Sequence, residues 1–498
     1  MANYIGIDLG TSFSAVATLD ETGRPIIIAN EDGINITASV VTIDSANKAI
    51  VGEEARKSLW TDSNTIGRFK RDMGTSQTYH AHGSEYTPTD LSAFVLKKLK
   101  EYTINAIQDI EEAVVTIPAN FTNEAREATM AAAKLAGLNV KYIINEPTAA
   151  ALFYAWKSGE ELSGKYAVYD LGGGTFDISI IDVAGQNIEV LATNGVSKLG
   201  GDDFDLIVQS KIGKKFKEAS GKEMDLEDYT KNDAEEEKKS LSKREKCSQR
   251  ISRVPIEIAR HEFEEAISSL VTQTEMLCET TLHEADLSIN DIKGIFLVGG
   301  STRVPCVRES VLKVFKKEPI TSANVDEVVA LGAAIYAAYK SDRTKLSAIQ
   351  KKSVNKVKVS EITAKCFGVI SQGFDQARGQ AKLQNSIMIM KGEKIPASVT
   401  EPFFTTHDGQ ESVACKITES SAPETDPKFV KVIWEGELKL PSGRPAEQQI
   451  DVTYSYNDNQ IMECSFVDVA SGETLPVNLE MASASDAAGD SIDKFIVE

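Results

Sequence analysis

Residues 167–180 read AVYDLGGGTFDISI, and the organisation of the whole chain follows from this stretch. Apolar residues stand on both sides of a glycine run, which predicts two strands joined by a tight reversal. An ordinary hairpin needs only one glycine. The backbone N–H groups of Gly172, Gly173 and Gly174 suit a phosphate, and the carboxylates of Asp170 and Asp177 suit a hard cation. The stretch therefore predicts a hairpin whose tip binds phosphate and metal.

A second stretch, YIGIDLGTSFSAVA at residues 4–17, has the same organisation. Asp8 takes the place of Asp170, and one glycine and two small hydroxyl residues follow it: Gly10, Thr11 and Ser12. Two related hairpins predict two similar halves that face each other across a cleft and grip a nucleotide from both sides. Neither turn has the GxxxxGK[ST] pattern and no helix follows directly, so the P-loop class is disfavoured.

Composition narrows the class of protein further. The chain has 498 residues, which is too long for one typical core, and a net charge of −20, which argues against nonspecific binding to nucleic acid or acidic membranes. The six cysteines are scattered without a CxxC pair, so we expect reduced thiols rather than a zinc site or disulfides. No apolar run approaches the length of a membrane span, and we expect a cytoplasmic protein.

Two polar residues have both a structural and a functional interpretation. Lys70 lies in the basic segment NTIGRFKRDMG, where a lysine is usually a solvated surface residue. Glu146 stands at the start of a predicted alanine-rich helix, where an acidic residue is favoured by the helix dipole. These patterns alone do not decide between the structural and the functional interpretation of either residue.

Three further segments carry polar residues at predicted turns or helices. The segment SKLGGDDFD, residues 197–205, predicts a turn into a helix whose backbone amides are available to a phosphate. Residues 225–260 are charge-rich and predicted to be mostly helical. The segment IFLVGGSTRVP, residues 295–305, predicts a strand that ends in a ligand-contacting turn.

In order and spacing, these motifs resemble the ATPase domain of the seventy-kilodalton heat-shock chaperones. The matching motifs are DLGTS at 8–12, INEPTAA at 144–150, DLGGGTFD at 170–177, LGGDDFD at 199–205 and VGGSTR at 298–303. Sugar kinases and actin-like filament proteins share single phosphate turns, but the pair INEPTAA and GGGTFD is specific to the chaperones. The resemblance implies an α/β, actin-like domain of two lobes around the nucleotide, and hydrolysis of ATP to ADP and phosphate.

The resemblance also implies roles for the matching residues. Phosphates would be held by Gly10, Thr11, Ser12, Gly172, Gly173, Gly174, Thr175, Gly200, Gly201 and Asp202. Hydrated Mg²⁺ and the attacking water would be positioned by Asp8, Asp170 and Glu146, and K⁺ would lie near Asp177 and Thr175. The residues that take part in catalysis would be Lys70, Glu146, Asp170 and Thr175. Adenosine would be contacted by Glu235, Lys238, Lys239, Ser242, Gly299, Gly300, Ser301, Arg303 and Asp326.

The resemblance divides the chain into four parts. Residues 1–340 are expected to be the ATPase domain, 341–362 an exposed linker, 363–480 an all-β sandwich, and 481–498 a disordered tail too short for the family's helical lid. In the linker, polar residues replace the family's docking run of leucines, which predicts weakened coupling between the domains. Residues Val369, Phe403, Val413 and Cys415 are expected to line a peptide groove, although each has an alternative interpretation as sandwich core.

Together these features predict an ATP-dependent chaperone that binds extended segments of unfolded proteins, with peptide affinity controlled by ATP binding and hydrolysis. A J-domain co-chaperone and a nucleotide-exchange factor would be its further partners, with neither nucleic acid nor membrane among them. The alternative is a nucleotide-sensing adaptor for one dedicated partner. The missing lid favours that alternative, as do Gln372, which stands where the family usually has a smaller or apolar group, and Tyr142, which stands where many members have an arginine.

Overall fold

The computed structural model describes residues 3–45, 48–158, 162–320, 324–375, 379–457, 460–479, 492 and 495–498. The chain divides into two compact units. Unit 1 comprises Met1–Phe121, Ala128–Val359 and Ala484–Glu498, and unit 2 comprises Thr122–Glu127 and Ser360–Ser483. The boundary between Val359 and Ser360 lies inside the segment that the sequence predicts to be a linker.

Unit 1 contains two sheets of the same design. In the first, the hairpin β1 (Tyr4–Asp8) and β2 (Phe13–Leu19) is extended by parallel pairing of β1 with β10 (Glu112–Ile117). The remaining strands are β3 (Pro25–Ile28), β4 (Thr37–Ala38) and β11 (Val140–Asn145). We call this sheet with its helices lobe I.

In the second sheet, the hairpin β12 (Ser163–Leu171) and β13 (Phe176–Ala184) is extended by parallel pairing of β12 with β17 (Ile292–Val298). The strands β14 (Asn187–Val196) and β18 (Lys358–Ser360) complete the order β17-β12-β13-β14-β18. We call this sheet with its helices lobe II. The shared design confirms the predicted α/β fold of two similar halves.

Two helices join the lobes at their centre. Helix α9 (Val328–Lys340) packs on β1, and helix α4 (Glu146–Ser158) packs on α9. A Cβ on Gly332 would lie 1.7 Å from the carbonyl oxygen of Ala149, and one on Gly6 would lie 2.1 Å from the backbone nitrogen of Ala334. Only glycine permits these two approaches, because the nearest atoms belong to the backbone.

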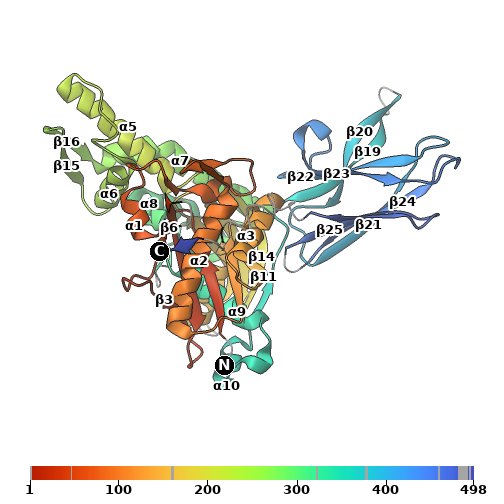
Figure 1. Cartoon of the computed structure of the whole chain (residues 1–498), viewed down its shortest axis with the longest axis horizontal. Coiled ribbons are helices and arrows are strands. Elements are labelled where there is room, and N and C mark those ends of the chain that lie inside the picture. Colours follow the sequence, from red (N-terminus) through yellow and green to blue (C-terminus); the bar gives the residue numbers. More distant parts are fainter. Residues whose placement is uncertain are drawn as a thin grey trace. The chain divides into compact units, whose positions relative to one another are not determined.

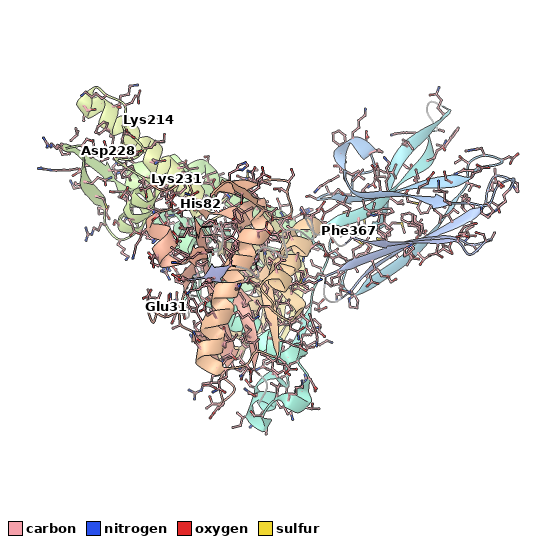
Figure 2. The ribbon with its side chains drawn as sticks, viewed as in Figure 1. Glu31, His82, Lys214, Asp228, Lys231 and Phe367 are labelled. Atoms are coloured by element: carbon pink, nitrogen blue, oxygen red, sulfur yellow. The ribbon has the colours of Figure 1, made fainter. Side chains whose placement is uncertain are left out.

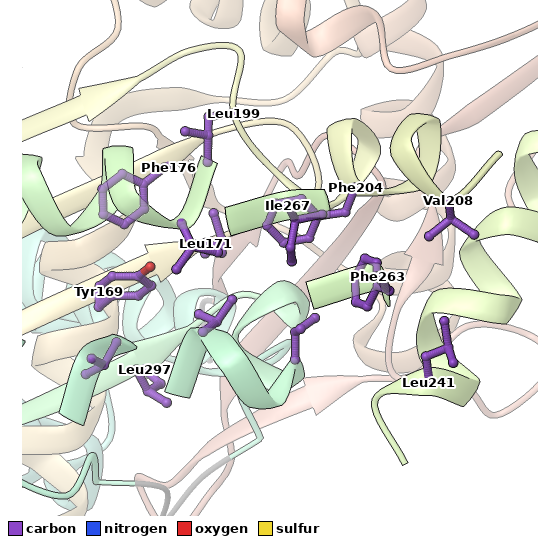
Figure 3. Close-up of a cluster of buried hydrophobic side chains, with 14 of the residues drawn as sticks. Tyr169, Leu171, Phe176, Leu199, Phe204, Val208, Leu241, Phe263, Ile267 and Leu297 are labelled. Carbon is purple, nitrogen blue, oxygen red and sulfur yellow. The ribbon is translucent and has the colours of Figure 1, made fainter. Parts of the chain in front are cut away.

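The core of lobe II lies between the second sheet and four helices (Figure 3). It contains Tyr169, Leu171, Phe176, Phe204 and Phe263, all of which are at most 1% exposed. The helices are α5 (Gly201–Ser220), α6 (Lys231–Leu241), α7 (Arg260–Glu284) and α8 (Pro305–Phe315).

The prediction that residues 225–260 are mostly helical is wrong in its second half. Helix α6 ends at Leu241, and the hairpin β15 (Lys246–Ile251) and β16 (Val254–Ala259) follows. Ile251, Ile256 and Ile258 of this hairpin are buried in the lobe II core. Burial of alternate apolar residues on one strand face, rather than charge density, decides the structure here.

A third sheet of unit 1 has the order β27-β6-β5-β7, with β5 (Val40–Ser45), β6 (Lys48–Val51), β7 (Thr65–Gly67) and β27 (Ile496–Val497). Figure 1 marks the C-terminal end of the chain beside β6. The prediction of a disordered tail is therefore wrong for the described residues of this segment. Around the sheet lie α1 (Glu53–Lys57), β8 (Tyr79–Ala81), β9 (Ser84–Tyr86), α2 (Pro88–Ile107) and the 3-10 turn η1 (Phe69–Asp72).

Residues 341–362 are not a plain exposed connection. They form the 3-10 turn η5 (Arg343–Lys345), helix α10 (Ala348–Val354) and strand β18, and Leu346, Val354 and Val357 are buried. The backbone N–H of Lys358 donates to the carbonyl oxygen of Gln186, 3.2 Å away. Strand pairing of β18 uses backbone groups, so the polar residues at 358–361 do not prevent it.

Unit 2 is built on two four-stranded antiparallel sheets, in the orders β20-β19-β22-β23 and β21-β24-β25-β26. The strands are β19 (Cys366–Asp375), β20 (Gln380–Ile389), β21 (Ala397–Phe404), β22 (Ser412–Ser420), β23 (Lys431–Lys439), β24 (Gln449–Tyr456), β25 (Met462–Asp468) and β26 (Thr474–Asn478). Phe367 of one sheet, labelled in Figure 2, packs against Tyr456 of the other with ring centroids 5.6 Å apart. The predicted β-sandwich is confirmed.

The remaining described elements connect these layers. They are helix α3 (Asn123–Leu135) and the 3-10 turns η3 (Ile289–Asp291), η4 (Gly300–Arg303) and η6 (Pro427–Phe429). No helix among the described residues has both the length and the apolar character needed to cross a membrane.

Candidate functional site

The tips of the two central hairpins meet in unit 1. A Cβ on Gly173 would lie 2.1 Å from the Ser12 hydroxyl oxygen, and one on Gly174 would lie 2.6 Å from the methyl carbon of Thr11. The tip after β12 therefore needs glycine at both positions to lie against the tip after β1. This arrangement brings together the two motifs from which the sequence predicts a two-sided grip.

A cavity of about 420 Å³ opens beside these tips. Most of the residues predicted for the nucleotide, and none of those predicted for peptide, line it. The predicted residues at its wall are Asp8, Gly10, Thr11, Ser12, Lys70, Glu146, Asp170, Gly172, Gly173, Thr175, Asp202, Glu235, Lys238, Lys239, Ser242, Gly299, Gly300, Ser301, Arg303 and Asp326. Gly174, Gly200, Gly201 and Asp177 are not among the residues that line it.

The turn before α5 contacts the hairpin tip after β12. The amide of Gly201 donates to the carbonyl oxygen of Gly172 at 3.0 Å, and the amide of Asp202 donates to that of Gly173 at 2.8 Å. The amide of Gly200 donates to the Asp203 carboxylate at 2.9 Å. The amides of Gly201 and Asp202 thus bind the hairpin tip, and the amide of Gly200 binds within the turn itself. Phosphate binding by Gly200, Gly201 and Asp202 stays a prediction.

Lys70 is 4% exposed, so its interpretation as a solvated surface residue is wrong. The turn η1 presents it, and the preceding Arg68 has a left-handed backbone with φ of 63°. The Lys70 Nζ lies 2.6 Å from Oε1 of Glu146, the first residue of α4. The pair places one ammonium group and one carboxylate at the cavity wall.

Two more carboxylates, those of Asp8 and Asp170, lie at this end of the cavity. Burial raises the pKa of both, and the negative charge of Glu146 raises the pKa of both further, whereas the positive charge of Lys70 lowers it. The Thr116 hydroxyl donates to Asp8 Oδ1 at 3.2 Å. Three neighbouring carboxylates face one lysine, and the raised pKa values of Asp8 and Asp170 reflect the cost of ionising them together. A bound cation would offset that cost.

Asp177 is the cross-strand partner of Asp170 and is 2% exposed. The amide of Asn120 donates to its Oδ1 at 3.3 Å. Among the described residues, no three Asp, Glu, His or Cys side chains are close enough together to hold a metal ion directly. The predicted metal set of Asp8, Asp170 and Asp177 is therefore not a preformed direct coordination shell.

A further part of the cavity wall is formed by α6, by η4 and by the residues just before α9. Lys238 pairs with Asp205 at 2.8 Å, and Arg303 pairs with Asp326 at 2.7 Å. Burial raises the pKa of Glu235, but the charges of Lys239 and Arg56 outweigh this effect and lower that pKa to about 2. The polar residues of this part are thus held by ion pairs.

Several lining residues are not among the predicted ones. They are Phe13, Ile36, Asp205, Lys243, Val298, Val304, Val325 and Val329. Most are apolar and lie in segments whose pattern indicates core strands or helices, so no local signal separates them from ordinary core residues. Arg68 and Arg71, beside Lys70, also lie near the site, where they pair with Asp202 at 2.7 Å and with Asp203 at 3.1 Å.

The residues predicted to bind peptide lie in the sandwich. Val369 and Cys415 are 4% and 1% exposed and belong to its core, and Phe403 and Val413 are half-buried against that core. Their alternative interpretation as core residues is correct for Val369 and Cys415. A role in peptide binding stays a prediction for all four.

Comparison with known proteins agrees with this geometry. The family model described as Hsp70 protein matches residues 4–82 and 75–498. The chain belongs to the Hsp70 family. It is also 36% identical over 497 residues to "Chaperone protein DnaK" of Mycoplasma mobile, an alignment that covers 96% of this chain and 78% of that relative. As a member of this family, the chain is an ATPase and an ATP-dependent chaperone that binds unfolded polypeptides.

Proposed function

We propose that the cavity of unit 1 binds ATP and ADP with the phosphates at the two hairpin tips and the adenosine against α6 and η4. The observation that carries this proposal is the contact between the tips, where glycine alone fits against Thr11 and Ser12. The hydroxyl groups and the glycine backbone at this end suit phosphate oxygens. The valines at 298, 304, 325 and 329 give the cavity the apolar wall that a nucleobase needs.

We infer that Asp8, Asp170 and Glu146 hold a hydrated Mg²⁺. The mutual repulsion of these neighbouring carboxylates fits a divalent cation, and the lack of a direct three-ligand set among the described residues fits an ion held through its own waters. When bound, the ion would neutralise phosphate charge. A K⁺ near Asp177 and Thr175 stays a further prediction.

Lys70 is proposed as the catalytic lysine. Its ammonium group is buried, and Glu146 fixes it at 2.6 Å. A buried, fixed positive charge needs no reorganisation when negative charge shifts among phosphate oxygens during transfer. Glu146 and Asp170 would also orient the attacking water by accepting its protons in hydrogen bonds, and Thr175 would hold phosphate beside them.

Nucleotide is proposed to control peptide binding by unit 2 through the docked strand β18. A ligand shifts a two-state equilibrium only if it binds the two states with different affinity. The strand joins the lobe II sheet directly before unit 2, so a change in that sheet changes the start of the sandwich segment. A J-domain partner, a nucleotide-exchange factor and a cytoplasmic location are part of this proposal. The polar residues of the linker are no argument against this coupling, because β18 pairs despite them.

The test is the fluorescence anisotropy of a labelled, extended apolar peptide on the ADP-bound protein, followed by a chase with Mg-ATP. Faster peptide release on ATP than on ADP supports nucleotide-controlled peptide binding. Equal release rates with hydrolysis intact would contradict the coupling. No peptide binding with hydrolysis intact would overturn the assignment of general peptide binding and favour the adaptor alternative.

A further inference from the structure

A short segment at the end of the sequence occupies a groove on unit 1 that the nucleotide site does not use. Strand β27 pairs in parallel with β6, in the register Ile496 to Lys48 and Val497 to Ala49. The amide of Glu498 donates to the carbonyl oxygen of Ala49 at 2.9 Å, and the amide of Val51 donates to that of Glu498 at 2.7 Å. The segment thereby becomes the edge strand of the third sheet.

The side chains of the segment fill a built site rather than a flat edge. Phe495 is 6% exposed and meets the rings of Phe94, at 5.0 Å between centroids, and Tyr86, at 6.4 Å. Ile492 and Val497 are also buried, at 1% and 8% exposed. Three apolar side chains therefore point into the protein from this one short segment.

Polar groups fix the direction of the segment in the groove. The Lys97 Nζ of α2 donates to the carbonyl oxygens of Ile492 at 3.2 Å and of Phe495 at 3.0 Å. The Lys48 Nζ lies 2.8 Å from the Glu498 carboxylate. Backbone pairing, apolar pockets and two lysines together are the features by which a sheet edge captures an extended peptide.

We propose that the groove between β6 and α2 is a strand-binding site whose ligand is the chain's own Ile492 and residues 495–498, docked reversibly. The pattern that it recognises is an aliphatic residue at 492, an aromatic residue at 495, an aliphatic residue at 497 and an acidic residue at 498. Reversibility follows from the small size of the contact. β27 has only two residues, and Ile496 is 66% exposed. The docked segment attaches to unit 1 the chain that follows unit 2.

The test uses a labelled peptide of residues 491–498, SIDKFIVE, and the chain truncated after Asp490. We expect the peptide to bind the truncated chain and the full chain to bind it about tenfold or more weakly, because its own segment competes. A peptide with Phe495→Ala should also bind about tenfold or more weakly, because a buried aromatic anchor is lost. No binding to the truncated chain would overturn the proposal.

Matched variants of α2 separate this groove from other peptide sites. In the truncated chain, Lys97→Ala should weaken binding of the peptide, whereas Lys100→Ala should leave it unchanged, because the Lys100 Nζ donates instead to the carbonyl oxygens of Ala136 and Gly137. Equal effects of the two variants would contradict the assignment of Lys97 to the peptide site.

Amide hydrogen exchange at Val51 in the full chain supplies a second measurement, with faster exchange expected for Phe495→Ala. A dimer that exchanges the segment between chains would overturn docking within one chain.

Discussion

At the scale of the residue, the buried positive charge of Lys70 is expected to promote ATP hydrolysis. The Lys70→Ala variant removes a buried positive charge and leaves Glu146 without its partner at 2.6 Å. We expect hydrolysis to slow by about 10²–10³-fold, the usual cost of one preorganised electrostatic group. Affinity for ADP should change little, because most of the cavity wall is unaltered. Single-turnover hydrolysis and an ADP titration measure the two quantities, and normal turnover would refute the assignment.

Asp170 tests the proposed metal site. In the Asp170→Asn variant the side chain keeps its size and loses its charge, so one of three buried carboxylates no longer attracts the cation. We expect nucleotide affinity in the presence of Mg²⁺ to fall about 10–100-fold, the range measured when groups around a metal are altered.

Titrations with and without Mg²⁺ separate this effect from a general loss of binding, since the deficit should vanish without the ion. Asp182→Asn is the matched control, because Asp182 lies on the strand paired with β12 but forms a surface pair with Lys165 at 3.6 Å. An unchanged Mg²⁺ titration for Asp170→Asn would remove Asp170 from the metal site.

At the scale of the element, the crossing of α4 and α9 depends on one glycine. The Gly332→Ala variant would place its Cβ 1.7 Å from the Ala149 carbonyl oxygen, which belongs to a buried helix backbone. The two helices must separate, so we expect the free energy of unfolding of unit 1 to fall by about 1–3 kcal/mol. Denaturant titration of unit 1 measures this change.

A control glycine lies in the interior of α5. A Cβ on Gly213 would have its nearest contact at 3.5 Å, from the methyl group of Met224. The Gly213→Ala variant should be neutral or stabilise the protein by up to about 1 kcal/mol, because alanine lowers the entropy cost of helix formation. Equal destabilisation by both variants would contradict the role of close packing at Gly332.

The same scale shows what the sequence can predict. The two hairpins, their tips and most lining residues can be predicted from local patterns. Alternating apolar residues indicate strands, and glycine runs indicate the turns between them. The burial of Lys70 does not follow from its neighbours, since Glu146 lies 76 positions away. The local sequence likewise does not indicate that the amides of Gly201 and Asp202 donate to the carbonyl oxygens of Gly172 and Gly173. Contacts distant in sequence decide both cases.

At the scale of the whole molecule, unit 1 holds the chain on both sides of the sandwich segment. Strand β18 adds to the edge of the lobe II sheet just before unit 2, and β27 adds to the edge of the third sheet after it. The small and polar residues that dominate the tail indicate disorder. This average composition gives no sign that three apolar residues of the tail are buried: Ile492, Phe495 and Val497. Their burial depends on a groove formed by residues more than 390 positions earlier, such as Lys97.

The docked segment has a path to the nucleotide site through α2. Phe495 packs on Phe94 of this helix, and the Ser92 hydroxyl lies 3.6 Å from the sulfur of Met73, which directly follows the turn that carries Lys70. Releasing the segment with Phe495→Ala should loosen the start of α2 and so the position of Lys70. We expect hydrolysis to slow by about 2- to 5-fold with unchanged ADP affinity, a typical size for coupling through packed side chains.

Single-turnover hydrolysis of the Phe495→Ala variant measures this effect, with Phe374→Ala as the control, because Phe374 is a 68% exposed aromatic residue of the sandwich. Adding the peptide SIDKFIVE to the truncated chain should restore the rate, since the groove is filled again without the covalent connection. Restoration would show that α2 responds to occupancy of the groove itself. If hydrolysis by the Phe495→Ala variant is as fast as hydrolysis by the unaltered chain, the proposed coupling through α2 is contradicted. The segment would then only attach the chain to unit 1.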